Sequence, residues 1–243
     1  MNIQIVENEK KLSAAIAGEI ENVVREKEDA LMCLCAGHSP VRVMKRLVSD
    51  AQENKYPADS FRFLSLDEWV GLGIGDPGSC IHDVSKYFLK PLKIERGERM
   101  FFFDGQSEDL KKECNGAAQF IEQNGGAIDV ILLGIGMNGH IGFNEPGTKE
   151  TDGIRVVPLS QTSKTVGAKY FDKDYALTSG ITIGIPQIMQ AKKVIVMAFG
   201  EHKADIVEQA VRGEKTEDCP VTLIRGHADI TFYFDKAAAK KIV

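Results

Sequence analysis

Three side chains that can transfer protons stand in two short segments of the sequence. His140 and Glu145 lie five residues apart in one segment, and Asp67 begins an Asp-Glu-Trp triplet earlier in the chain. A histidine can both take and give a proton near neutral pH, and a carboxylate can hold its ring in place. A carboxylate beside an aromatic ring can be a base with a raised pKa. Proton transfer on a small molecule is therefore one function to test; a solvated turn and a structural histidine are the alternatives.

The segment that carries His140 begins with an apolar run at residues 128–133, typical of a buried parallel strand. A glycine-rich turn, Gly134-Ile-Gly-Met-Asn-Gly139, comes next. Its spacing also occurs in dinucleotide-binding loops, but there a helix begins at the third glycine. Two more glycines and a proline follow Gly139 within eight residues, which no ordinary helix start contains. We therefore predict a loop where a small substrate approaches backbone amides, with His140 and Glu145 at its rim.

A second loop has the features of an anion site. The apolar run at residues 31–35 ends in Ala-Gly-His-Ser-Pro, and a helical pattern starts at Val41. Ser39 is a suitable N-cap and Pro40 a suitable first helical residue. Free amides at such a helix start favour a phosphate, although every strand-to-helix turn has them.

The elements that position these loops alternate between apolar strands and amphipathic helices. This alternation predicts an α/β fold, a single Rossmann-like domain over residues 1–243 with a doubly wound, mostly parallel sheet and helices on both faces. The loops that follow the strands would then meet at one edge of the sheet, where such folds bind ligands. Residues 148–175 lack a clear period and predict a lid. The predicted strands are 31–35, 61–66, 100–104, 128–133, 194–199 and 230–234, and the predicted helices are 8–27, 79–89, 108–123 and 204–212.

Composition limits the partners. The 243 residues are 43% hydrophobic and 27% charged, as in an ordinary globular protein. A net charge of -5 without a basic stripe argues against nucleic acid. No signal peptide or membrane-spanning run is visible, and five cysteines without framework spacing predict a reducing, cytoplasmic location. Histidines and cysteines lack metal-ligand spacing, so no metal is predicted.

The sequence contains three motifs, which are Leu66-Asp67-Glu68-Trp69-Val70-Gly71-Leu72, Gly134-x-Gly136-x-Asn138-Gly139-His140-x-x-x-Asn144-Glu145-Pro146 and Ala176-Leu177-Thr178-x-Gly180. They resemble the glucosamine-6-phosphate deaminase/isomerase family, and the similarity covers nearly the whole chain in order. The family usually carries Asp where Asn138 stands and Tyr where Trp69 stands, so the sequence is closer in motif to the galactosamine-6-phosphate branch.

The resemblance implies an enzyme that isomerises and deaminates an amino-hexose 6-phosphate. Galactosamine-6-phosphate would give tagatose-6-phosphate and ammonia, with glucosamine-6-phosphate, giving fructose-6-phosphate, as the next substrate. By the same resemblance, Asp67 moves a proton between C2 and C1, and His140 opens the sugar ring. Glu145 orients His140, and Asn138 holds the geometry.

The resemblance also implies which residues bind the phosphorylated sugar. No cofactor, nucleic acid or membrane is expected to take part, and the chain can form a homo-oligomer. Lys203 would be the main phosphate cation and Lys169, in the lid, a second one. A 6-phosphogluconolactonase-like hydrolase and a non-catalytic sugar-phosphate-binding module are the alternatives. The remaining predicted substrate contacts are Gly37, His38, Ser39 and Gly136.

Overall fold

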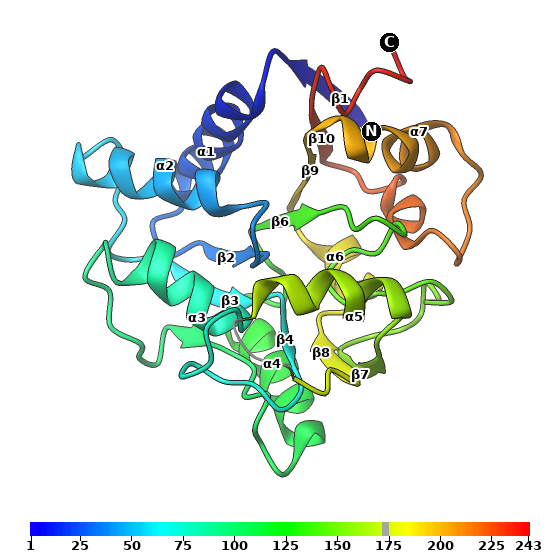
Figure 1. Ribbon diagram of the computed structural model, residues 1–243. Coiled ribbons are helices and arrows are strands. Elements are labelled where there is room, and N and C mark those ends of the chain that lie inside the picture. The colour runs from blue at the N-terminus through cyan, green and yellow to red at the C-terminus, as the bar shows by residue number, and fades with distance from the viewer. Residues whose placement is uncertain (172–174) are drawn as a thin grey trace.

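A sheet of seven parallel strands forms the centre of the molecule. In this computed structural model, which describes residues 1–171 and 175–243, the strand order is β1-β10-β9-β6-β2-β3-β5 (Figure 1). The central strands β2 and β6 are apolar and almost wholly buried, as strands covered on both faces must be. The predicted parallel α/β fold is confirmed. The strands are β1 (Asn2–Val6), β2 (Leu31–Leu34), β3 (Arg62–Ser65), β5 (Met100–Phe101), β6 (Val130–Gly134), β9 (Lys193–Ala198) and β10 (Ile230–Asp235).

Helices cover both faces of this sheet. Figure 1 shows α1 and α2 on one side and α6 and α7 on the other. In α1, Leu12, Ile16 and Ile20 form a fully buried stripe, and the Asn8 side chain caps the first turn. The helices are α1 (Glu9–Glu26), α2 (Val41–Gln52), α3 (Cys80–Val84), the π-helix η1 (Ser85–Leu89), α4 (Leu110–Gln123), α5 (Gln161–Gly167), α6 (Ile185–Gln190), α7 (Ala204–Arg212) and the 3-10 turns η2 (Ala168–Tyr170), η3 (Glu201–Lys203) and η4 (Pro220–Ile224).

A second, antiparallel sheet was not predicted. It pairs β4 (Asp67–Trp69) with β8 (Ser179–Thr182), and β8 with β7 (Arg155–Pro158). The strand β4 has only three residues, too few for a pattern, and a glycine interrupts β8. That glycine, Gly180, lies under the Phe143 ring: a Cβ there would be 2.3 Å from Phe143 Cδ2. Gly180 interrupts the apolar pattern of β8, yet the packing of Phe143 requires a glycine at this position. The edge strand β1 was also missed.

The segment predicted as a lid, residues 148–175, has regular structure. It contains β7, α5 and η2, and its residues 172–174 lie outside the described residues. Arg155 fixes its first part, because its guanidinium donates to Asn144 Oδ1 and Thr148 Oγ1, each at 3.0 Å. Opening and closing of this segment stays a prediction.

The strand order places a ligand crevice between β2 and β6. From β2 the chain continues to β3 and β5 on one side, whereas from β6 it continues to β9 and β10 on the other. Neighbouring strands whose connections leave in opposite directions open a crevice at their carboxyl ends. In the part of the chain that the structure describes, no helix has the length and apolar character needed to span a membrane.

Candidate active site

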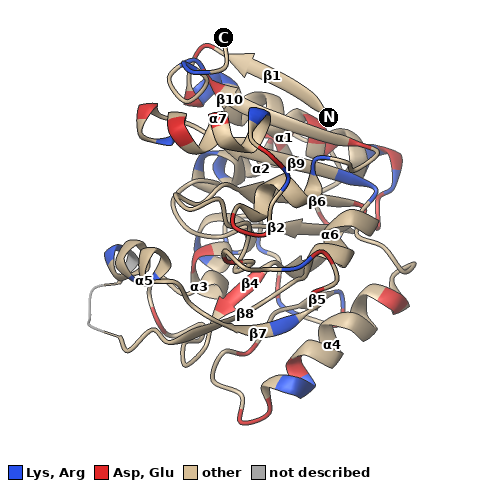
Figure 2. Cartoon of the chain, turned by 90° about the vertical axis from the view of Figure 1, so that its right-hand side faces the viewer, with Lys and Arg blue, Asp and Glu red and all other residues tan. Residues whose placement is uncertain are grey.

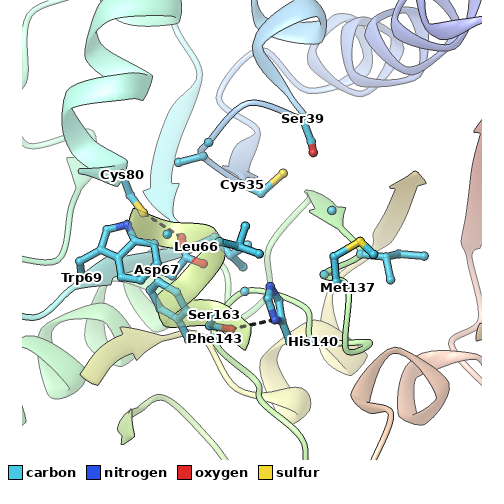
Figure 3. Close-up of a pocket in the computed structure, with 18 of the residues that line it drawn as sticks. Cys35, Ser39, Leu66, Asp67, Trp69, Cys80, Met137, His140, Phe143 and Ser163 are labelled. Carbon is cyan, nitrogen blue, oxygen red and sulfur yellow. Dashed lines mark hydrogen bonds between the residues drawn. The ribbon is translucent and has the colours of Figure 1, made fainter. Parts of the chain in front are cut away.

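A cavity of about 130 Å³ lies at the carboxyl ends of β2 and β6 (Figure 3). The turn after β2 and the loop after β6 form two of its walls, β4 and the start of α3 form a third, and α5 closes it. Lys203, at the end of η3, lines it as well. The strand ends predicted to gather at one edge of the sheet therefore do so at the switch in strand order.

The loop after β6 presents His140 to this cavity. No helix begins at Gly139, so the dinucleotide-binding geometry does not form. Instead, Gly136 N donates to His140 O at 2.9 Å, which folds the loop back on itself. A Cβ on Gly136 would be 2.3 Å from His140 Nε2, so only glycine lets the ring lie there.

The His140 ring lies against a buried carboxylate. Its Nδ1 is 3.2 Å from Ser163 Oγ and 3.6 Å from Glu145 Oε2. Burial alone would raise the pKa of Glu145, but the hydrogen bond and charge of His140, with smaller contributions from Ser163 and Asn138, lower this pKa to about 2. Glu145 is therefore an anion at neutral pH.

Asn138 makes hydrogen bonds to Glu145, to Ser160 and to the backbone of His140, and not to the imidazole ring, among the described residues. Its Nδ2 donates to Glu145 Oε2 at 3.0 Å and to Ser160 Oγ at 3.1 Å, and its Oδ1 accepts from His140 N at 3.3 Å. Ser160 N adds a donor to Glu145 Oε1 at 3.3 Å. A neutral amide in this place keeps the negative charge on Glu145 alone.

Asp67 lies on another wall, in apolar surroundings. Figure 2 shows the acidic residues of β4 in the middle of the molecule, and Asp67 is only 8% exposed. Burial raises the pKa of Asp67 to about 6, while a hydrogen bond from the Cys80 thiol and the charge of His140 act in the opposite direction. Trp69 and Phe143, whose rings lie 4.7 Å apart, complete this wall. A carboxylate with this pKa is a suitable general base near neutral pH.

The strand β8 brings Asp67 and His140 to the same cavity. Thr182 pairs with Asp67 across the antiparallel sheet, and its Oγ1 accepts from Phe143 N at 3.1 Å. Asn144 adds a bond from Nδ2 to Ile183 O at 2.8 Å, which fixes the loop of His140 to the residue that follows this strand. Figure 3 shows both side chains facing the cavity.

This geometry agrees with what the chain is similar to. The family model described as glucosamine-6-phosphate isomerases/6-phosphogluconolactonase matches residues 6–232. The chain belongs to this family.

Relatives in the glucosamine-6-phosphate isomerase/6-phosphogluconolactonase family match over the full length. "Glucosamine-6-phosphate deaminase 2" of Bacillus subtilis is 34% identical over 100% of this chain and 98% of its own. A glucosamine-6-phosphate deaminase of Bacillus velezensis is 35% identical over 98% of this chain and 99% of its own. The solved structure of a monomeric glucosamine-6-phosphate deaminase, described as the missing link of the NagB superfamily, has a TM-score of 0.93 and 31% identity, covering 99% of this chain and 100% of its own. A 6-phosphogluconolactonase of Trypanosoma brucei, 20% identical with a TM-score of 0.77, shares the fold.

Not every predicted site residue of this family member reaches the cavity. Among the described residues, Asp67, His140, Gly37, Ser39, Gly136 and Lys203 line it. Glu145 and Asn138 lie behind His140. His38 and Lys169 are exposed and do not line the cavity.

Two details of the phosphate-binding prediction change. Pro40, not Ser39, is the N-cap of α2, and the helix begins at Val41 without a side-chain cap. Lys203 Nζ donates to Ile135 O at 2.6 Å, and burial lowers the pKa of Lys203 to about 8. The lysine is still largely protonated at neutral pH, but it loses charge in mild alkali.

Two residues that contact the proton-transfer groups were not predicted from the sequence. Ser163 touches His140, and its only sequence signal is its place three residues after Ser160, the N-cap of α5. Cys80 touches Asp67 across 13 positions of sequence, and no pattern marks this contact.

Proposed function

We propose that this protein converts an amino-hexose 6-phosphate into a ketose 6-phosphate and ammonia. One observation supports this most: a buried carboxylate with a raised pKa and a histidine backed by a carboxylate face one cavity. The full-length relatives are named glucosamine-6-phosphate deaminases, and that name describes chemistry that needs both groups.

In this proposal, His140 catalyses the opening of the sugar ring. The imidazole takes the proton of the anomeric hydroxyl and gives a proton to the ring oxygen, and the C1–O5 bond breaks to give the aldehyde. Glu145 stabilises the imidazolium formed in between, as a carboxylate does in a catalytic triad. Ser163 keeps the ring in place, because its Oγ lies 3.2 Å from Nδ1.

Asp67 acts as the base in the isomerisation. It takes the C2 proton, the electron pair forms the C1=C2 bond, and the aldehyde oxygen takes up a proton from the substrate's own ammonium group, which gives a neutral enolamine. Asp67 then returns its proton to C1, and C2 becomes an iminium carbon. Water adds to this carbon, and ammonia leaves to give the ketone. The apolar wall of Trp69 and Phe143 keeps the carboxylate desolvated and therefore basic.

The phosphate is assigned to Lys203 and the amides of the turn after β2. Lys203→Ala should raise KM about 10-fold or more and change kcat little, because the contact is equal in ground and transition states. Lys203→Arg should remove the alkaline rise in KM that begins near pH 8, since arginine stays charged. An unchanged KM in Lys203→Ala would contradict the assignment.

For the sugar epimer, the motif and the relatives point in different directions. Asn138 and Trp69 favour galactosamine-6-phosphate, whereas the relatives carry the name of glucosamine-6-phosphate deaminases. We keep the galactosamine preference as a prediction, with glucosamine-6-phosphate as the second substrate. A higher kcat/KM for glucosamine-6-phosphate would overturn it. Self-association of the chain is likewise a prediction, and the molecular mass measured by analytical ultracentrifugation would test it.

The deciding experiment is ammonia release from each amino-sugar phosphate, followed with a coupled dehydrogenase, with Asp67→Asn as the inactive control. Release from either sugar supports the function. Hydrolysis of 6-phosphogluconolactone without ammonia release would replace it with the lactonase activity, which removes no C–H proton and needs no base at Asp67. Binding of these sugars without any turnover would indicate that the protein is a non-catalytic sugar-phosphate-binding module.

A further inference from the structure

Cys80 is the first residue of α3 and lies against the proposed base. Its thiol donates to Asp67 Oδ1 at 3.3 Å, drawn as a dashed line in Figure 3. Within residues 1–171 and 175–243, the Cys80 thiol is the one side chain that donates a hydrogen bond to this carboxylate. Both residues are buried, with Cys80 7% and Asp67 8% exposed. The contact therefore takes place out of water, where a weak donor still affects a carboxylate.

Glu68 fixes Cys80 in this position. Its carboxylate, 1% exposed, accepts from Cys80 N at 2.9 Å and from Ile81 N at 2.8 Å. Glu68 and Asp67 are neighbours on β4, so the same strand holds the backbone of Cys80 and receives its thiol. The position of the Cys80 side chain is thus set by two contacts to one strand, one from its backbone and one from its thiol.

The thiol decides which carboxylate oxygen is available. It occupies Oδ1, whereas Oδ2 faces Gly142, where a Cβ would be 3.5 Å away. Gly142 lines the cavity. The oxygen nearest Gly142 is therefore the one placed to take a substrate proton. Because a thiol is a weaker donor than a hydroxyl, it orients the carboxylate without greatly weakening the base.

We propose that Cys80 is a positioning residue that orients Asp67 for proton transfer and tunes its strength as a base through the S–H···O hydrogen bond. This inference rests on the proposed role of Asp67 as the base. It concerns a cysteine that none of the three motifs contains.

Other titratable groups surround Asp67 and stay the same when Cys80 is changed. Burial raises the pKa of the Cys80 thiol far above its usual range, so it stays a donor at working pH. The surrounding groups are His140 from the loop after β6, Glu68 on β4, the thiols of Cys33 on β2 and Cys35 just after it, and Lys203 across the cavity.

The test is the acid limb of the pH profile of kcat/KM, which reports the free enzyme's base. Cys80→Ala removes the donor, so the limb should move to higher pH by about half a unit to one unit. Cys80→Ser supplies a stronger donor, so the limb should move to lower pH by a similar amount. A purely structural role would not shift the two variants in opposite directions. Cys114→Ser, on α4 and outside the cavity lining, is the matched control and should leave the limb unchanged.

Failure of this inference is distinguishable from failure of the proposed function. If the wild type releases ammonia, Asp67→Asn does not, and both Cys80 variants keep the wild-type limb, the inference is wrong and the function stands. If Asp67→Asn remains active, the base assignment is wrong and the inference falls with it.

A measurement on the unsubstituted thiol covers the case in which the Cys80 variants do not fold. Infrared difference spectra should show an S–H stretching band that shifts as Asp67 titrates around pH 6 and is constant in Asp67→Asn. An S–H band whose frequency stays constant through this titration in the wild type would overturn the inference.

Discussion

Two buried carboxylates of this protein, Asp67 in the wall of the cavity and Glu145 behind His140, have opposite electrostatic surroundings. Asp67 is held by a thiol among apolar side chains, and its pKa rises to about 6. Glu145 is surrounded by an imidazole, an amide and two serines, and its pKa falls to about 2. Burial disfavours the charge of both, so the difference comes from their donors. The same functional group therefore becomes a base in one place and a fixed anion in the other.

The largest effect is expected from Asp67→Asn. Loss of the base should lower kcat about 1,000-fold with substrate binding retained, since general base catalysis contributes roughly 100- to 10,000-fold. Steady-state kinetics and equilibrium binding of the substrate measure the two effects. Asp59→Asn, an exposed residue, is the control. A near-normal kcat would end the assignment of Asp67 as the base.

The same variant should also be more stable than the wild type above pH 6. The pKa of Asp67 is raised in the folded state, so its ionisation costs stability as the pH rises from about 4 through about 6. Asparagine removes this cost. Urea unfolding of both proteins between pH 4 and 8 should show a gain that grows to pH 6 and then levels off; a constant difference would contradict the raised pKa.

A smaller loss of activity is expected from Glu145→Gln, about 10- to 100-fold in kcat, because the imidazolium of His140 loses its anion. Its effect on stability has the opposite sign. The pKa of Glu145 is lowered in the folded state, so the stabilisation is present above about pH 4.5 and is lost as the pH falls toward 2. Glu150→Gln, on the exposed ion pair with Lys215, is the control. Equal stability of Glu145→Gln and wild type at pH 7 would argue against a lowered pKa.

The smallest effect is expected from Gly167→Ala, at the contact of α5 with the wall of Asp67. A Cβ there would be 2.5 Å from Trp69 Cη2, so α5 must shift, and Ser163 moves with it away from His140. We expect a loss of about 1–3 kcal/mol in stability, typical of overpacking, and a several-fold drop in kcat. Gly18→Ala in α1, with open space around it, should be neutral or stabilising. A fully active Gly167→Ala would show that α5 does not hold His140.

The central strands of the main sheet could be predicted from the sequence because they are buried on both faces and appear as apolar runs, whereas the exposed edge strand β1 could not. The strands β4 and β8 were also not predicted, since a three-residue strand and a glycine-centred one carry no period. Asp67, His140 and Glu145 were found in their motifs. Cys80 and Ser163 could not be found, because tertiary structure brings their elements to the cavity. The opposite pKa shifts also depend on these contacts, so the sequence cannot give them.

The most direct test of this comparison is a carbon-13 NMR titration of the side-chain carboxyl groups. Asp67→Asn and Glu145→Gln assign the two signals by their loss. We expect Asp67 to titrate near pH 6 and Glu145 to keep its ionised shift down to about pH 2. Two carboxyl groups that titrate together near their ordinary values, about pH 4, would contradict it.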